Sequence, residues 1–171
     1  MTKKRKQNRK NELSKKGAVE SIRFQTHIGL KQIGHKDTDM FHRLADTEIN
    51  VIAELDLTDD ILGIKNLVEG VRRALNVEPT LEKGDFCTSI VAIALRISKI
   101  PVLDDMKMPV VNWQDRINKK ILTLYYPEES RNAVAEWAKA NNYNTSTYLA
   151  RPVVKFKRLF IIIERTRTRT E

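Results

Sequence analysis

Apolar and polar positions along the chain form two series, each reading strand, helix, helix. In residues 49–57, Val51, Ala53 and Leu55 alternate with polar side chains, and this alternation predicts a strand. From Thr58 to Leu75, apolar residues recur every three or four positions behind a Thr-Asp-Asp start, which predicts an amphipathic helix. Residues 76–85 break that pattern. A second helix is expected over residues 86–99, and Pro101 ends it.

The second series begins at residue 119. Residues 119–126 are expected to be extended, with Leu122, Leu124 and Tyr126 on one side. Pro127 and the two acidic residues after it indicate a helix start, and residues 141–144 end that helix. A last helix is expected from about Thr145 toward Phe160. Pro152 predicts a kink or an early end in this helix, and residues 159–163 could instead form a short strand or a partner-binding edge.

The recurrence of the same order predicts an internal repeat with a period of roughly 60–70 residues. The expected organisation is a basic tail and arm (1–45), a first β-α-α repeat (46–100), a linker (101–116), a second β-α-α repeat (117–163) and a basic tail (164–171). Residues 1–16 are expected to be disordered because they have few apolar side chains. Residues 17–45 are expected to be an arm or a loosely helical segment.

The positive charge lies at the two ends of the chain. Residues 1–16 hold eight Lys or Arg against one Glu, and residues 155–171 carry a net charge of +4, whereas residues 17–154 carry about −2. Basic ends on a nearly neutral middle are typical of proteins that bind a polyanion, because each neutralised phosphate releases counterions. A membrane surface fits less well, since residues 3–16 have no apolar face.

Several other classes of function find little support in the sequence. A single cysteine, Cys87, and the absence of a secretion signal suit a reducing cytoplasm, which we expect to be bacterial. His27, His35 and His42 lack the spacing of metal ligands, so no metal or other cofactor is expected. No phosphate-binding loop or nucleophile motif is present, so we do not expect an enzyme.

Residues 119–126, the Pro-Glu-Glu start, the asparagine turn and Thr145-Ser146 together resemble the ribbon-helix-helix family of Arc and MetJ. Such a chain is similar to the accessory DNA-binding proteins of conjugative plasmid and T-DNA transfer. The resemblance implies an α+β fold, mostly α, in which two β-α-α repeats form a pseudo-dimer within one chain. Such a chain is expected to be a monomer in solution. One two-stranded antiparallel ribbon would then lie in the major groove of double-stranded DNA.

The resemblance also assigns roles to individual residues. On the outward face of the ribbon, the expected base-reading residues are Lys119, Ile121, Thr123, Tyr125, Asn50 and Ile52. At the starts of the second helices, Thr88, Ser89, Thr145 and Ser146 would bind phosphates or would simply cap the helices. Further phosphate contacts are expected from the tails, at Lys3, Lys4, Arg5, Lys6, Arg165, Arg167 and Arg169.

Two observations keep alternatives open. Glu54 and Asp56 would place carboxylates on the ribbon, so the first half could serve packing more than reading. Ile121 and Tyr125 could be covered by the arm or by a partner. The alternatives to a transfer factor are a repressor of the same fold and an antitoxin-like or scaffold module that binds other proteins and does not read DNA. For a transfer factor, other transfer or partner proteins are expected as further partners.

Overall fold

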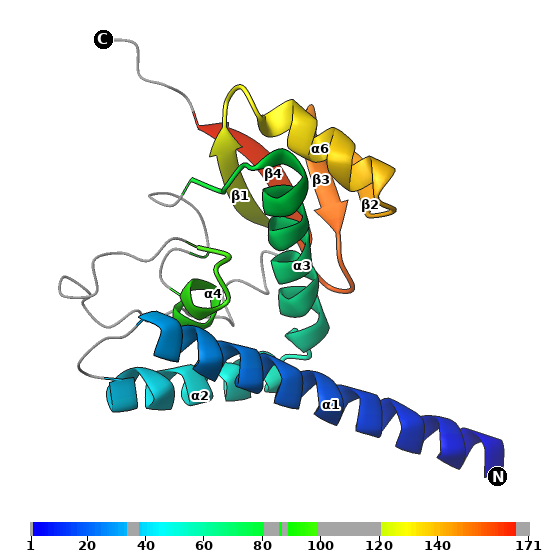
Figure 1. The fold of residues 1–171 in the computed structure, drawn as a ribbon. Coiled ribbons are helices and arrows are strands. Elements are labelled where there is room, and N and C mark those ends of the chain that lie inside the picture. The colour runs from blue at the N-terminus through cyan, green and yellow to red at the C-terminus, as the bar shows by residue number, and fades with distance from the viewer. Residues whose placement is uncertain (1, 34–37, 81–85, 87–88, 99–120, 167–171) are drawn as a thin grey trace.

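A computed structural model describes residues 2–33, 38–80, 86, 89–98 and 121–166 of the chain. Its N-terminal part is helical, with α1 (Thr2–Ile33), α2 (Thr38–Glu54), α3 (Thr58–Leu75) and the short α4 (Ile90–Ala94). Helices α1 and α2 lie side by side and run in opposite directions, and α4 packs against both of them (Figure 1).

The C-terminal part is a four-stranded mixed sheet with one helix of its own. Its elements are β1 (Ile121–Pro127), α6 (Arg131–Ala140), β2 (Asn144–Tyr148), β3 (Arg151–Lys155) and β4 (Phe160–Thr166). The strand order is β1-β4-β3-β2. Strand β1 runs parallel to β4, with Leu122 opposite Ile161, whereas the β3–β4 and β2–β3 pairs are antiparallel.

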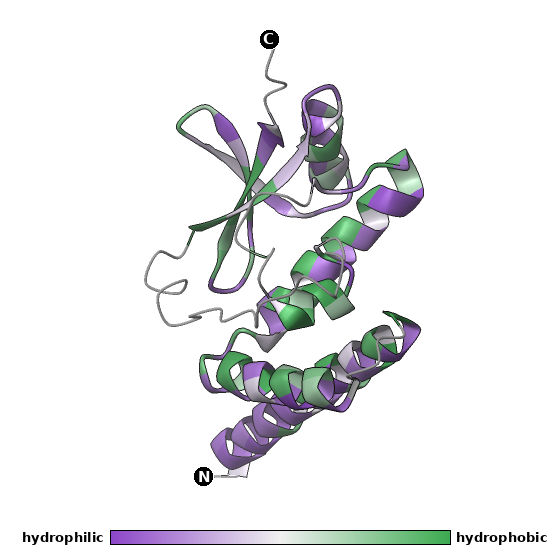
Figure 2. Cartoon of the chain, turned by 90° about the vertical axis from the view of Figure 1, so that its left-hand side faces the viewer, coloured by the Kyte–Doolittle hydropathy of each residue, from purple (hydrophilic) through white to green (hydrophobic). Residues whose placement is uncertain are grey.

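Helix α3 joins the two parts, rising from the α1–α2 pair toward the sheet (Figure 1). Its apolar stripe is buried over Ile61, Ile64, Leu67, Val68 and Val71, and the inward residues of β1 and β4 belong to the same core. The hydropathy colouring shows that the helix nearest the N-terminus is mostly hydrophilic, whereas hydrophobic stretches lie on the other helices and on part of the sheet (Figure 2).

Glycines allow the close approaches between these elements. A Cβ added to Gly29 on α1 would lie 2.0 Å from the carbonyl oxygen of Ala94, at the end of α4. On α3, a Cβ at Gly63 would lie 2.8 Å from the ring of Phe156, and one at Gly70 would lie 2.4 Å from the ring of Trp137. Both parts of the chain therefore depend on positions without a side chain to reach their packing distance.

The expected ribbon-helix-helix pseudo-dimer is wrong. The described residues form five helices and a four-stranded mixed sheet, and not two β-α-α repeats around a two-stranded ribbon. The proposed first ribbon strand, residues 49–57, is instead the end of α2 and the turn after it. Ile49 and Ile52 are fully buried together with Phe41 and Ala45, a helical spacing that outweighs the local alternation.

The last expected helix is also wrong, because residues 144–155 form the β2–β3 hairpin. The alternative of a strand near residues 159–163 is confirmed by β4, whose Ile161 and Ile163 are buried. Residues 2–16, expected to be disordered, form the first half of α1. By contrast, the helix over Thr58–Leu75 and the inward positions of Leu122, Leu124 and Tyr126 are confirmed.

Candidate nucleic-acid interface

The first half of α1 is a positively charged rod. We call residues 2–16 the basic half of α1. Its side chains are all exposed, and the buried residues of this helix, Ile22, Thr26 and Leu30, all lie in its second half. The basic half therefore extends beyond the packed helices (Figure 1). A helix segment that is polar on every side gains no stability from burial, so another role must explain its composition.

The cations of the basic half surround the helix axis. They are Lys3, Lys4, Arg5, Lys6, Arg9, Lys10, Lys15 and Lys16, against the single acid Glu12. At about 100° per residue, these side chains leave no sector wider than about 100° without a positive charge. From Lys3 to Lys16 the axis is about 20 Å long at 1.5 Å per residue. This is a charge density of the same order as that of B-DNA.

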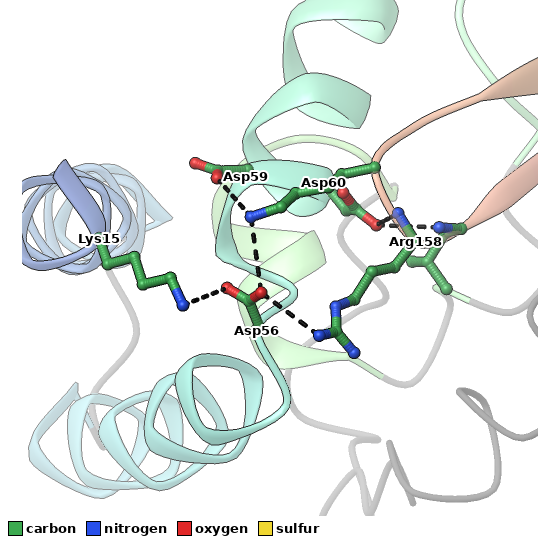
Figure 3. Close-up of polar contacts among 7 residues, drawn as sticks. Lys15, Asp56, Asp59, Asp60 and Arg158 are labelled. Atoms are coloured by element: carbon green, nitrogen blue, oxygen red, sulfur yellow. Dashed lines mark hydrogen bonds and ion pairs between the residues drawn. The ribbon is translucent and has the colours of Figure 1, made fainter. Parts of the chain in front are cut away.

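Lys15 ties the basic half to the rest of the molecule through Asp56. Its Nζ atom lies 3.9 Å from Asp56 Oδ1, and Asp56 Oδ2 lies 3.5 Å from Lys157 Nζ and 3.4 Å from an Arg158 guanidinium nitrogen (Figure 3). Lys157 and Arg158 are half exposed on the β3–β4 turn. Lys157 Nζ also lies 3.6 Å from Asp59 Oδ2, so in this cluster the three cations Lys15, Lys157 and Arg158 stand against two acids. Asp56 therefore links α1 to the turn.

The same turn is fixed to α3 by a buried carboxylate. Asp60 is 1% exposed, and its Oδ2 atom accepts hydrogen bonds from the backbone amides of Arg158 at 2.8 Å and Leu159 at 2.9 Å (Figure 3). Burial raises the pKa of Asp60, although the backbone hydrogen bonds act in the opposite direction. In the sequence, the position of Asp60 in the first turn of a helix accounts for an acidic residue by itself, so nothing there reveals this contact.

The expected base-reading residues do not share one surface. Asn50 is exposed on α2, where it accepts a hydrogen bond from Arg23, and Ile52 on the same helix is fully buried. Ile121, Thr123 and Tyr125 lie half-buried on the face of β1 opposite Leu122. Lys119 lies outside the described residues. The described residues do not form the two-stranded ribbon that was expected to bring these residues together.

Among the expected phosphate contacts, Ser89 has protein partners. It is fully buried as the N-cap of α4, accepts a hydrogen bond from Ala92 N at 3.0 Å and donates one to Glu48. Glu48 also accepts from Ile90 N at 3.1 Å. The protein's own carboxylate thus occupies the start of α4. Thr88 lies outside the described residues.

The remaining expected contacts lie on other elements or outside the described residues. Thr145 and Ser146 are on strand β2 and do not start a helix. Arg165, at the end of β4, lies 3.9 Å from Glu128. Arg167 and Arg169 lie outside the described residues. A phosphate-binding role for these residues stays a prediction, and of the expected tail contacts only Lys3, Lys4, Arg5 and Lys6 fall within the basic half of α1.

The sheet face opposite α3 and α6 carries a mixture of charged and aromatic side chains. The guanidinium of Arg151 lies 3.3 Å from the carboxylate of Glu164, and Lys155 Nζ lies 5.6 Å from the ring centre of Phe160. Burial alone would raise the pKa of Glu164, but the Arg165 amide and the Arg151 side chain together lower it. Since Glu164 partly balances the cations, this face is less positive than α1.

Two histidines meet between α1 and α2. The Nδ1 atoms of His27 and His42 are in hydrogen-bonding contact, the rings stack at 4.7 Å, and His27 Nε2 lies 2.7 Å from Asp46 Oδ1. This contact could not be predicted from the sequence, because the two residues lie on different helices. Within the part of the chain that the structure describes, no three potential ligands come together as a metal site.

No protein-family model matches the sequence, and no curated protein matches it either. None of the described helices is both long enough and apolar enough to cross a membrane.

Proposed function

We propose that this chain binds double-stranded DNA and that the basic half of α1 is its main contact. One observation carries this function: eight cations and one acid stand on a helical segment whose side chains are all exposed. Among the described residues, only Lys15 of these eight is seen in an ion pair, with Asp56. The other seven cations are available to phosphates.

The arrangement of the charges favours a duplex over an acidic protein partner. A helix in the major groove has a phosphate backbone on each side, so cations around the whole helix can be used. A helix that docks on a protein surface contacts it with one face, which would leave the cations on the other side without partners. A membrane surface would require an apolar face, and Leu13 is the only large apolar residue in the basic half.

Lys157 and Arg158 support the same contact from the β3–β4 turn. Asp56 holds both of them near Lys15, and Asp59 also pairs with Lys157, so this cluster adds a net charge of only +1 to the surface along which a duplex would lie. The expected role in plasmid or T-DNA transfer depended on the ribbon-helix-helix arrangement, and this fold lends it no support. What remains is DNA binding dominated by the phosphate backbone, with little dependence on base sequence.

The experiment is a fluorescence-anisotropy titration of a labelled random-sequence duplex at low salt. The test variant replaces all eight cations of the basic half with Gln, which preserves helix propensity. A matched pair of variants replaces three exposed cations each with Gln: Lys4, Arg5 and Arg9 in the basic half, and Arg43, Lys139 and Lys155 elsewhere as the control. For the same number of charges removed, the first variant of this pair should weaken binding more than the control. We expect affinity to fall roughly a hundredfold or more in the test variant and about threefold at most in the control.

Two outcomes would overturn the proposal. The first is an unchanged affinity in the eight-Gln variant, with circular dichroism showing that the fold is retained. The second is tighter wild-type binding to poly-glutamate than to the duplex at the same salt concentration, which would favour an acidic protein partner.

A further inference from the structure

A cleft of about 410 Å³ lies between α1, α3 and the end of α4. Its apolar part is formed by Ile28 and Gly29 of α1 and by Ala94 and Leu95, and two amide side chains, Gln25 and Gln32, stand beside it. A volume of this size falls in the range of sites for small molecules and is far too small to admit a duplex. Any ligand of the cleft must therefore be a small molecule, and the cleft is a site distinct from the DNA contact of α1.

The rest of the lining is mainly cationic. Four cations face the cleft, at Lys65, Arg72, Arg73 and Arg96, together with one acid, Glu69. Glu69 lies 3.7 Å from Lys65 and 3.2 Å from Arg73, so one carboxylate is shared between two cations. Arg72 is paired with Glu78 at 2.9 Å. Counting both acids, the cleft keeps a net charge of +2.

The cations are held in place by contacts between the elements. Lys65 donates a hydrogen bond to the side-chain oxygen of Gln25, which links α3 to α1. A guanidinium nitrogen of Arg72 donates to the carbonyl oxygen of Arg96 at 2.9 Å, which links α3 to the turn after α4. These bonds limit the freedom of the side chains, so less conformational entropy is lost when an anion binds.

Arg96 occupies a backbone position that favours glycine. Its φ is 61°, and the amide of Ile97 bonds to the carbonyl oxygen of Ala92 at 2.9 Å, which closes the end of α4 in a left-handed turn. A residue with a Cβ is strained there. The Arg96 side chain is exposed, and no acidic side chain of the described residues is seen to pair with its guanidinium. Within the described part of the chain, the turn therefore places a cation without an acidic partner at the edge of the cleft.

We propose that this cleft binds a small organic phosphate, such as a nucleotide. The phosphate groups would lie against Arg73 and Arg96, with Arg72 and Lys65 adding positive charge. The apolar part of the ligand would pack on Ile28 and Leu95. The side-chain amide of Gln32 would bond to its polar edge, since the amide of Gln25 already bonds to Lys65 and Ser21. This site does not depend on DNA binding by α1.

Arg96→Gly is the sharpest test, because glycine relieves the backbone strain while it removes the guanidinium. We expect the full chain to bind ATP in isothermal titration calorimetry, and inorganic pyrophosphate more weakly, since pyrophosphate has no group for the apolar part of the cleft. The Arg96→Gly variant should be at least as stable as the wild type in thermal unfolding and should bind ATP about tenfold or more weakly.

Two control variants separate the site from general effects. Ala150→Gly relieves a similar left-handed position, φ 61°, in the β2–β3 turn, and Lys139→Ala removes an exposed cation on α6. Both should leave the ATP affinity unchanged. The same variants are then titrated with duplex DNA, for which Arg96→Gly should bind like the wild type.

Three results would overturn the proposal. They are an absence of ATP and pyrophosphate binding at millimolar concentration, equal ATP affinity of the wild type and Arg96→Gly, and a loss confined to duplex binding in Arg96→Gly. The last result would assign the cleft to a backbone phosphate of DNA. Failure of DNA binding by α1 would leave the ATP result unaffected, so the two proposals can be judged apart.

Discussion

The side chain of Asp60 accepts a hydrogen bond of 2.9 Å from the backbone amide of Leu159, which lies 99 residues further along the chain. A second bond from the neighbouring amide joins the first turn of α3 to the β3–β4 turn. This contact fixes the sheet against the helix that also packs on α1. It therefore sets where Lys157 and Arg158 lie relative to the basic half of α1.

Asp60→Ala should lower the free energy of unfolding by about 2–4 kcal/mol, because it leaves two backbone amides near the buried site without an acceptor. The measurement is urea unfolding followed by circular dichroism. Asp59→Ala is the matched control, since Asp59 is 55% exposed and, among the contacts seen, pairs only with Lys157 at 3.6 Å. This variant should lower the free energy of unfolding by less than about 1 kcal/mol. Equal losses in the two variants would contradict the role given to Asp60.

The pKa of Asp60, raised by burial above its ordinary value of 3.8, also gives a pH dependence of defined sign. A carboxyl with a raised pKa binds its proton more tightly in the folded state, so its contribution to stability is largest below pH 3.8 and is lost as the pH rises through the raised pKa. The free energy of unfolding of the wild type minus that of Asp60→Asn should therefore fall as the pH increases. A difference that grows with pH would show that the pKa is lowered.

Removing the hydroxyl of Tyr126 should not lower the free energy of unfolding. Its hydroxyl is fully buried and has no hydrogen-bond partner among the described residues, and burial raises its pKa. Tyr126→Phe should leave stability unchanged or increase it by up to about 1 kcal/mol, because a buried polar group without a partner is unfavourable. As a control for packing around this strand, Leu124→Ala should lower the free energy of unfolding by about 2–5 kcal/mol. A loss above about 1 kcal/mol in Tyr126→Phe would reveal a partner for the hydroxyl.

Replacing two glycines of α1 with Ala should change the stability of the protein in opposite directions. Gly29→Ala should be strongly destabilising, by about 2 kcal/mol or more, because the new Cβ would clash with the backbone of Ala94. Gly17→Ala meets nothing within 4 Å and should stabilise the exposed part of α1 by up to about 1 kcal/mol. Thermal unfolding of both variants checks the pair, and a Gly29→Ala protein as stable as the wild type would mean that α1 and α4 are further apart.

Sequence patterns could predict the elements whose periodicity is unambiguous. The stripe of α3 and the alternation of β1 are long and have clear boundaries, and both were confirmed. Residues 49–57 are different, because their alternation coincides with a helical face built on Ile49 and Ile52. The core around Phe41 and Ala45 decides between the two, and that packing is not visible in a local window.

The β2–β3 hairpin was missed because its turn carries no turn residues. Leu149 and Ala150 both have positive φ, at 48° and 61°, in a two-residue loop that ordinarily contains Asn and Gly. Without that signal, Thr145 and Ser146 looked like the start of a helix. For the candidate sites, the basic run of α1 could be found from composition alone. The cleft at Arg96 and the buried Asp60 could not, because both depend on contacts between distant segments.

The salt dependence of duplex binding tests the central claim most directly. If the basic half of α1 neutralises about seven phosphates, the logarithm of the wild-type association constant should fall with the logarithm of salt concentration with a slope of about −6. In the variant with all eight cations replaced by Gln, the slope should lie between about −2 and zero. A slope that is the same in both proteins would contradict the account, because the phosphate contacts would then have to come from another surface.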